Sequence, residues 1–171
     1  MIAQELVLNY PEKVKKVVLC STHYGFAKSV LPSDEVMEVL TADVSALALS
    51  AEEVARMTIP LLFTEEFIKN NADLKELMVQ QILKAPISNE AFMHQGSAIM
   101  QFDTYDRLSQ IKTPTLILHG KQDILIPAEN GSILGKAIPG ARLVSFENCA
   151  HGLLEETEEV LGTILEFLAE S

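Results

Sequence analysis

Two short segments combine the residue types of a proton-transfer site with the positions that such a site needs. In residues 116–127, an apolar stretch leads to Gly120 and then to Asp123. In residues 148–152, His151 stands between two small residues. A carboxylate beside an imidazole fixes the tautomer of the ring and stabilises its charged form during proton transfer. The two segments therefore predict an acid–base pair.

Both candidate residues follow predicted strands. Short aliphatic and β-branched runs are typical of strands buried on both faces, and three occur, at Val14–Cys20, Thr115–Gly120 and Ala141–Phe146. Helical patterns alternate with these strands, which predicts an α/β fold with a parallel sheet. Sites in open parallel sheets lie beyond the carboxyl ends of the strands, which is where Asp123 and His151 fall.

The first and last helices are predicted from their apolar spacing. Met1–Tyr10 carries Ile2 and Leu6, with the flanking Ala3 and Val7, at helical spacing. It ends before a proline, which cannot continue a helix. We expect the final helix to run unbroken over Leu153–Leu168. Its apolar face is predicted to consist of four leucines, Leu154, Leu161, Leu165 and Leu168.

Residues 26–104 lack strand patterns and predict about four or five short helices. Ser50–Glu53 has the form of a capping box, in which each end of the tetrapeptide satisfies a backbone amide of the other. Pro60 and Pro86 are expected to separate helices. This block forms a predicted helical lid between the first two strands. The predicted core consists of residues 1–25 and 105–171.

The pattern strand–Gly-x-x-Asp-x-x-x-Pro, with Gly120, Asp123 and Pro127, and the later Ala-His-Gly before a Glu-rich helix resemble the α/β-hydrolase superfamily. The similarity is closest to its lidded carboxylesterase and lactonase-like members and extends over essentially the whole chain. It implies a partial α/β-hydrolase fold, with about three parallel strands, flanking helices and an inserted all-helical lid. It also implies that Asp123 orients His151 and that His151 is the general base, because the family orders its triad as Ser, Asp, His.

The nucleophile expected from this resemblance is absent from the chain. No Gly-x-Ser-x-Gly occurs, and neither Gly96-Ser97 nor Gly131-Ser132 has the required spacing. The family pattern places the nucleophile about four residues before Met1, and the oxyanion-hole amides also upstream. We therefore expect a truncated or split hydrolase that is inactive alone.

Two other functions remain open. The first is a two-chain esterase that acts on a small-molecule ester once a separate N-terminal fragment supplies the nucleophile. The second is a non-catalytic binding module, in which the Val14–Cys20 strand is an unpaired sheet edge that recruits a second copy into a homodimer.

Other residues with reactive side chains have plainer interpretations. Cys149 lies two residues before His151 and is a conceivable substitute nucleophile, although a buried inert thiol is the favoured interpretation. Cys20 and His23 either line the edge of the site or pack. No cluster has the spacing of a metal site, His94 included, and no cofactor is expected.

The lid is rich in methionine. Methionine-rich surfaces adapt to varied apolar ligands, so an apolar substrate group is one interpretation, and core packing of short helices is the favoured one. Five of the six methionines lie in this block: Met37, Met57, Met78, Met93 and Met100.

The composition indicates which partners and which cellular compartment to expect. The formal net charge is −11, with 13 basic against 24 acidic residues, so a basic surface for nucleic acid is not expected. No apolar stretch reaches the roughly 18 residues of a membrane span. Two cysteines are too few for a disulfide scaffold, which together with the absence of a leader pattern predicts a cytoplasmic protein.

Overall fold

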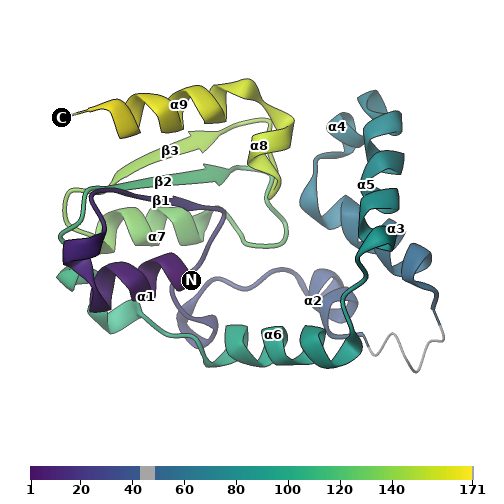
Figure 1. Ribbon diagram of the computed structural model, residues 1–171, viewed down its shortest axis with the longest axis horizontal. Coiled ribbons are helices and arrows are strands. Elements are labelled where there is room, and N and C mark those ends of the chain that lie inside the picture. Colours follow the sequence, from purple (N-terminus) through teal and green to yellow (C-terminus); the bar gives the residue numbers. More distant parts are fainter. Residues whose placement is uncertain (43–48, 171) are drawn as a thin grey trace.

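The computed structural model describes residues 1–42 and 49–170, and is built on a three-stranded parallel sheet (Figure 1). The strands are β1 (Val17–Cys20), β2 (Thr115–Gly120) and β3 (Arg142–Phe146), in the order β1-β2-β3. The predicted α/β class with about three parallel strands is confirmed. The first strand begins three residues later than predicted, because Val14 ends a 3-10 turn that precedes it.

The central strand β2 forms the middle of the hydrophobic core. All six of its residues are buried, and successive side chains point to opposite faces. Ile117 packs in the cluster that includes Leu134 of α7 (Glu129–Ala137). Leu116 packs on the other face, with Val160 of α9 (Glu158–Ala169). Figure 1 shows α7 and α1 (Ile2–Asn9) on one side of the sheet and α9 on the other.

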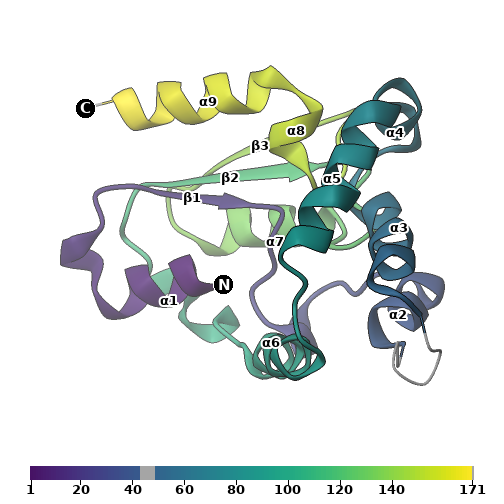
Figure 2. The ribbon, with the colours of Figure 1, turned by 45° about the vertical axis from the view of Figure 1, so that its right-hand side comes forward.

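Among the described residues, five α-helices lie between β1 and β2. They are α2 (Asp34–Thr41), α3 (Ala51–Leu62), α4 (Glu65–Asn70), α5 (Ala72–Lys84) and α6 (Asn89–Gln101). Figures 1 and 2 show α3, α4 and α5 opposite the carboxyl ends of the strands. We call residues 26–104 the helical insertion; 43–48 of this predicted lid lie outside the described residues. The rest of the range contains helices and no strand, as predicted.

Helix ends in the insertion follow the predicted caps. Ser50 accepts a hydrogen bond from the backbone N–H of Glu53, whose carboxylate accepts from the N–H of Ser50, so the predicted capping box is present. The role predicted for Pro60 is wrong, because Pro60 lies inside α3. A proline there removes one backbone hydrogen bond, and the helix ends two residues later, at Leu62.

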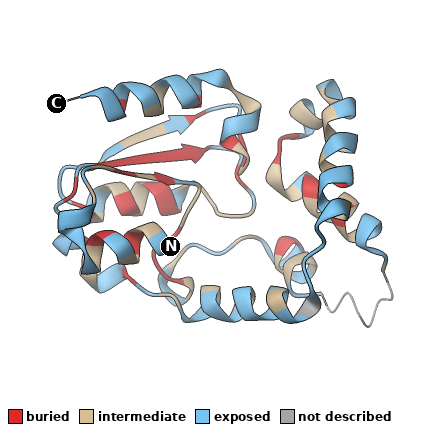
Figure 3. Ribbon diagram, viewed as in Figure 1, coloured by how far each residue is buried: buried red, intermediate tan, exposed pale blue. Residues whose placement is uncertain are grey.

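The insertion has a small hydrophobic cluster of its own. Its buried members are Ala55, Ile59, Phe63 and Val79, all from α3, α5 or the junction after α3. Figure 3 shows β2 as buried, whereas most of α5 and α6 is exposed. The division into a core at 1–25 and 105–171 and a separate lid at 26–104 stays a prediction.

The final helix differs from its prediction. It breaks at Thr157, which adopts an extended conformation between α8 (Leu153–Glu156) and α9, and caps α9 through its hydroxyl. Val160, Ile164 and Phe167 then face the sheet. The four leucines of the predicted apolar face are instead exposed by 50–58%: Leu154, Leu161, Leu165 and Leu168.

The first helix buries only part of its predicted apolar set: Val7 lies in the core cluster and Ala3 packs against it. Ile2 is 88% exposed and Leu6 43%, whereas Gln4 and Val7 are buried. The Gln4 amide donates to the carbonyl of His23 (2.8 Å) and accepts from the Thr104 hydroxyl (2.6 Å). A buried polar side chain is tolerated when its hydrogen bonds are satisfied, and the partners of Gln4 lie 19 and 100 residues away.

Candidate active site

The turn after β2 holds Asp123 in a buried position. The strand ends at Gly120, and the Asp123 side chain has no exposed surface. One carboxylate oxygen, Oδ1, accepts hydrogen bonds from the backbone N–H groups of Leu125 (3.0 Å) and Ile126 (2.8 Å). Asp side chains bond in this way to the backbone that follows them, which fixes the turn. The second oxygen, Oδ2, is therefore free to face the neighbouring loop.

That neighbouring loop, Cys149–Gly152, follows β3 and carries His151. The N–H of Gln122 donates to the carbonyl of Cys149 (2.9 Å), and the Ser21 hydroxyl donates to the carbonyl of His151 (3.0 Å). A Cβ atom at Gly120 would overlap the carbonyl oxygens of this loop, so glycine is needed for the close approach. The ends of β1 and β2 thus fix the backbone around His151.

These two loops bring the predicted acid and base together. The His151 Nδ1 atom lies 2.9 Å from Asp123 Oδ2. An ionised carboxylate only accepts hydrogen bonds, so the geometry assigns the proton to Nδ1. The imidazole is 26% exposed, and its Nε2 has no hydrogen-bond partner among the described residues. The pair has the orientation that a general base requires; its catalytic role stays a proposal.

The ionised form of Asp123 is strongly favoured. Burial by itself raises the pKa of this carboxyl. Hydrogen bonds from His119, His151 and the Ile126 N–H outweigh that effect and lower the pKa to about 2. Asp123 is therefore a carboxylate at neutral pH and stabilises positive charge on His151.

His119 is a buried neighbour of this pair that sequence reasoning did not single out. It occupies β2, where its Nε2 lies 2.8 Å from the carbonyl oxygen of Ile126 and 3.5 Å from Asp123 Oδ2. Its Nδ1 is buried without a partner among the described residues, and Gly131 lies close to that side of the ring. A carbonyl only accepts, so Nε2 carries the proton. The only signal in the sequence is a polar residue at the end of an apolar strand.

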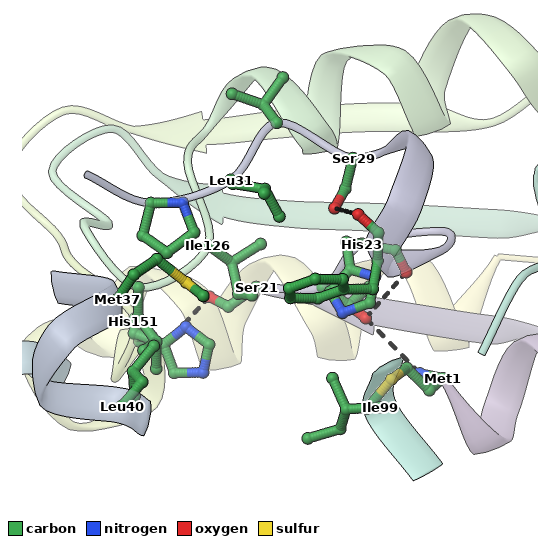
Figure 4. A pocket seen from close by; sticks show the side chains of 15 residues that line it. Met1, Ser21, His23, Ser29, Leu31, Met37, Leu40, Ile99, Ile126 and His151 are labelled. Carbon is green, nitrogen blue, oxygen red and sulfur yellow. Dashed lines mark hydrogen bonds between the residues drawn. The ribbon is translucent and has the colours of Figure 1, made fainter. Parts of the chain in front are cut away.

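A cavity of about 320 Å³ opens beside the pair (Figure 4). In that view His151 lies on the same side as Met37 and Leu40 of α2. His23, which the sequence suggested as an edge or packing residue, also lines the cavity, and burial lowers the pKa of its imidazole. The lining is mostly apolar and comes from the loops that follow the strands and from the insertion. It includes Phe26, Val30, Leu31, Met37, Leu40, Ile99, Leu125 and Ile126.

Neither Cys149 nor His94, the other candidate reactive residues, has the surroundings of a catalytic group. Cys149 is buried, and burial, together with Glu156 and Glu159, raises the pKa of its thiol to about 11. The thiol is then protonated at neutral pH, which favours the inert interpretation. His94 is exposed on α6. Within residues 1–42 and 49–170, no group of three or more His, Cys, Asp or Glu side chains could hold a metal ion.

The methionines of the insertion do not behave as one group. Met37 lines the cavity. Met57, Met93 and Met100 are 42%, 69% and 64% exposed, so the favoured interpretation as core residues is wrong for these three. No helix in the described part of the chain is long and apolar enough to cross a membrane.

Comparison with known proteins identifies the family. The model of a family described as serine aminopeptidase, S33, matches residues 1–158. The chain belongs to the α/β-hydrolase superfamily. A solved α/β-hydrolase enzyme from a Medee basin deep-sea metagenome library has the same fold, with a TM-score of 0.80 at 22% identity. That match covers 99% of this chain and 62% of the solved one.

Two relatives align along most of the length of this chain. A putative carbamate hydrolase, RutD, from Azorhizobium caulinodans is 27% identical over 166 residues, or 96% of this chain and 60% of the relative. The pimeloyl-[acyl-carrier protein] methyl ester esterase of Nitrosomonas europaea is 26% identical over 152 residues, 88% of this chain and 60% of the relative. The chain thus spans about three fifths of the length of each.

Proposed function

We propose that this chain supplies the acid and the base of a Ser-Asp-His triad that hydrolyses carboxylic esters. Asp123 orients the ring and His151 is the general base, while the nucleophilic serine and the oxyanion-hole amides come from a segment outside these 171 residues. The observation that carries the proposal is the 2.9 Å contact between His151 Nδ1 and Asp123 Oδ2 beside the apolar cavity.

The chemistry follows from the protonation states. His151 Nε2 takes the proton of the serine hydroxyl as that oxygen attacks the ester carbonyl, and the Asp123 carboxylate stabilises the imidazolium that forms. His151 then returns the proton to the departing alcohol, which leaves an acyl-serine. A water that gives its proton to His151 attacks the acyl-serine, the acid departs, and His151 returns the proton to the serine oxygen. The apolar lining suits an aliphatic acyl or alcohol group. An ester is the favoured substrate because a relative is named as a methyl ester esterase.

Without a nucleophile, the chain by itself is expected to be inactive. Loss of the serine from a triad lowers turnover by about a millionfold, and the remaining members do little alone. The test is hydrolysis of p-nitrophenyl acetate and butyrate by the purified chain, with His151→Ala as the matched control. We expect equal, background rates. Turnover that His151→Ala abolishes would contradict inactivity.

The second part of the test completes the triad. The DNA preceding the codon for Met1 is searched for a Gly-x-Ser-x-Gly segment, which is then joined to the chain or expressed beside it as a separate fragment. We expect ester hydrolysis that requires both the new serine and His151. Activity with the separate fragment supports the two-chain enzyme. A completed, folded protein that hydrolyses an amide or a carbamate but no ester would overturn the substrate class.

A non-catalytic homodimer is the second candidate, and the position of β1 favours it. Among the described residues β1 pairs only with β2, so its other edge is open. An open edge can pair with the same strand of a second copy around a two-fold axis. Sedimentation equilibrium is expected to give a dimer for the wild type and a monomer for Cys20→Lys, which places a charge on this exposed position. A monomeric wild type at high concentration excludes the dimer.

A further inference from the structure

The loop that carries His151 is held from two sides, and the second side is the helical insertion. The backbone N–H of Gly152 donates to the carbonyl of Leu62 at 2.7 Å. The Glu156 carboxylate accepts from the N–H of Thr64 at 2.7 Å through Oε1 and from the N–H of Ala150 through Oε2. Two of these hydrogen bonds reach the junction between α3 and α4, and the third joins Glu156 to Ala150. Through Glu156, the residues on either side of His151 are therefore both linked to the insertion.

Glu156 is the only side chain in this set of bonds. It projects from α8, five residues after His151, and is partly buried. Its two oxygens accept from backbone groups that lie on opposite sides of the contact, one in the His151 loop and one at the N-cap of α4. An ionised carboxylate forms stronger hydrogen bonds to backbone N–H groups than a neutral acceptor does. One charge thus holds both segments in place.

Close packing at Gly152 extends the same contact. A Cβ atom on Gly152 would overlap the ring of Phe63, so the ring lies directly against the backbone next to His151. The φ of Gly152 is −82°, which any residue can adopt, so the glycine is required only for space. Phe63 belongs to the hydrophobic cluster of the insertion with Ile59 and Val79. A displacement of that cluster therefore moves the ring away from the His151 loop.

We propose that Glu156 is a positioning residue that couples the placement of the helical insertion to the orientation of His151. With the insertion seated, the Ala150 and Gly152 amides are bonded and His151 points its Nδ1 at Asp123. When the insertion moves away, the Gly152 amide loses its partner at Leu62 and Glu156 loses the bond from Thr64. The carboxylate that accepts from Ala150 is then no longer held, and the ring loses its fixed orientation. The inference rests on the proposed role of His151 as the base, and makes the insertion a control on that base as well as a wall of the cavity.

The sharpest test changes the insertion and reads the effect at His151. Thr64→Pro removes the N–H that bonds to Glu156 and leaves the sequence of the His151 loop intact. Thr64 has a φ of −65°, and Phe63 before it is extended, so both conformations suit a proline. Thr64→Ala is the matched control, because it loses the same hydroxyl cap on Phe67 but retains the N–H. A second pair is Glu156→Gln with Glu155→Gln, its exposed neighbour.

The first readout is the tautomer of His151, measured by long-range ¹H–¹⁵N correlation at a pH of about 8, where an ordinary imidazole is neutral. We expect the Nδ1–H form in the wild type, Thr64→Ala and Glu155→Gln. Thr64→Pro and Glu156→Gln are expected to show a mixture with the Nε2–H form. The second readout is amide hydrogen exchange, which at Ala150 and Gly152 is expected to become on the order of tenfold faster in the same two variants.

Each outcome has one meaning. The coupling between the insertion and His151 is overturned if amide exchange accelerates while the His151 tautomer stays unchanged. It is also overturned if neither readout changes. If Glu156→Gln unfolds, the Thr64 pair decides alone. Asp123→Asn separates this inference from the proposed function. If His151 keeps its wild-type tautomer in Asp123→Asn, Asp123 does not orient the ring. If the tautomer shifts in Asp123→Asn but not in Thr64→Pro, only the role of Glu156 is overturned.

Discussion

The carboxyl end of the sheet and the helical insertion meet at the same cavity but are built differently. At the sheet end, β2 is buried along its whole length and the Asp123 carboxylate has no exposed surface. In the insertion, the buried cluster is small, and large apolar side chains such as Met93 and Met100 face outward. A strand covered on both faces has one stable position, whereas short helices over a small cluster can shift.

This contrast suggests a division of roles. The groups that must keep a fixed geometry, Asp123 and His151, are attached to the sheet. The groups that shape the cavity, including Met37, Leu40 and Ile99, come largely from the insertion. Binding and catalytic residues are commonly presented by loops on a rigid scaffold, and in this molecule the insertion forms part of the cavity wall. Four substitutions or conditions test this contrast between the sheet end and the insertion.

The largest effect is expected from a cavity in the sheet core. Ile117→Ala removes a side chain with no exposed surface, and we predict a loss of about 4 kcal/mol in the free energy of unfolding. Ile82→Ala is the matched control in α5, where the side chain is 40% exposed, and is predicted to cost less than about 1 kcal/mol. Urea unfolding measures both. Equal losses would remove the contrast between the two regions.

A methyl group at Gly120 is the next largest perturbation. Its Cβ would meet the backbone of Cys149 and Ala150, which cannot retreat without breaking the bond from Gln122. We predict that Gly120→Ala destabilises the fold by about 3 kcal/mol and accelerates amide exchange at Gln122. Thermal unfolding and hydrogen exchange provide the measurements. A variant as stable as the wild type would mean that the His151 loop is not held against β2.

The pH dependence of stability tests the charge on Asp123. Its pKa falls from 3.8 to about 2 on folding, so the folded state binds this proton less tightly than the unfolded state. The resulting stability, about 2 kcal/mol, is present above pH 4 and is lost as the pH falls through about 2. Unfolding of wild type and Asp123→Asn from pH 6 to pH 2 measures it. We expect the wild type to lose about 2 kcal/mol more than Asp123→Asn, and parallel curves would contradict the assignment.

The smallest effect has the opposite sign and lies in the insertion. Gly96 occupies the interior of α6 with open space around its Cβ position. Alanine reduces the entropy lost on forming a helix, so Gly96→Ala is predicted to stabilise the protein by about 0.5–1 kcal/mol. Gly162→Ala in α9, also with open space, is the control and should give a similar gain. Destabilisation at Gly96 alone would indicate that α6 packs against something not seen here.

Local patterns predicted much of the fold. The strand at Thr115–Gly120 has the predicted bounds, because six apolar or small residues in succession suit a strand buried on both faces. The sequence also predicted the capping box at Ser50 and Glu53, because both of its hydrogen bonds lie within four residues. The break in the final helix was not predicted, because threonine favours a cap over a helix interior only weakly. Whether the helix breaks at Thr157 depends on which of its side chains pack against the sheet.

The sequence by itself determined the family, the parallel strands, the inserted helices, and the presence of Asp123 and His151 just beyond strand ends. Only the tertiary structure decided that their side chains meet at 2.9 Å, that His119 lies behind Asp123, and that Glu156 joins the insertion to the loop of His151. The physical reason is the range of the interactions. Strand and cap patterns act between neighbours in the chain, whereas Glu156 bonds to a residue 92 positions away. A single carboxylate carries no sequence signal for such a partner until the sheet and the helices have been packed.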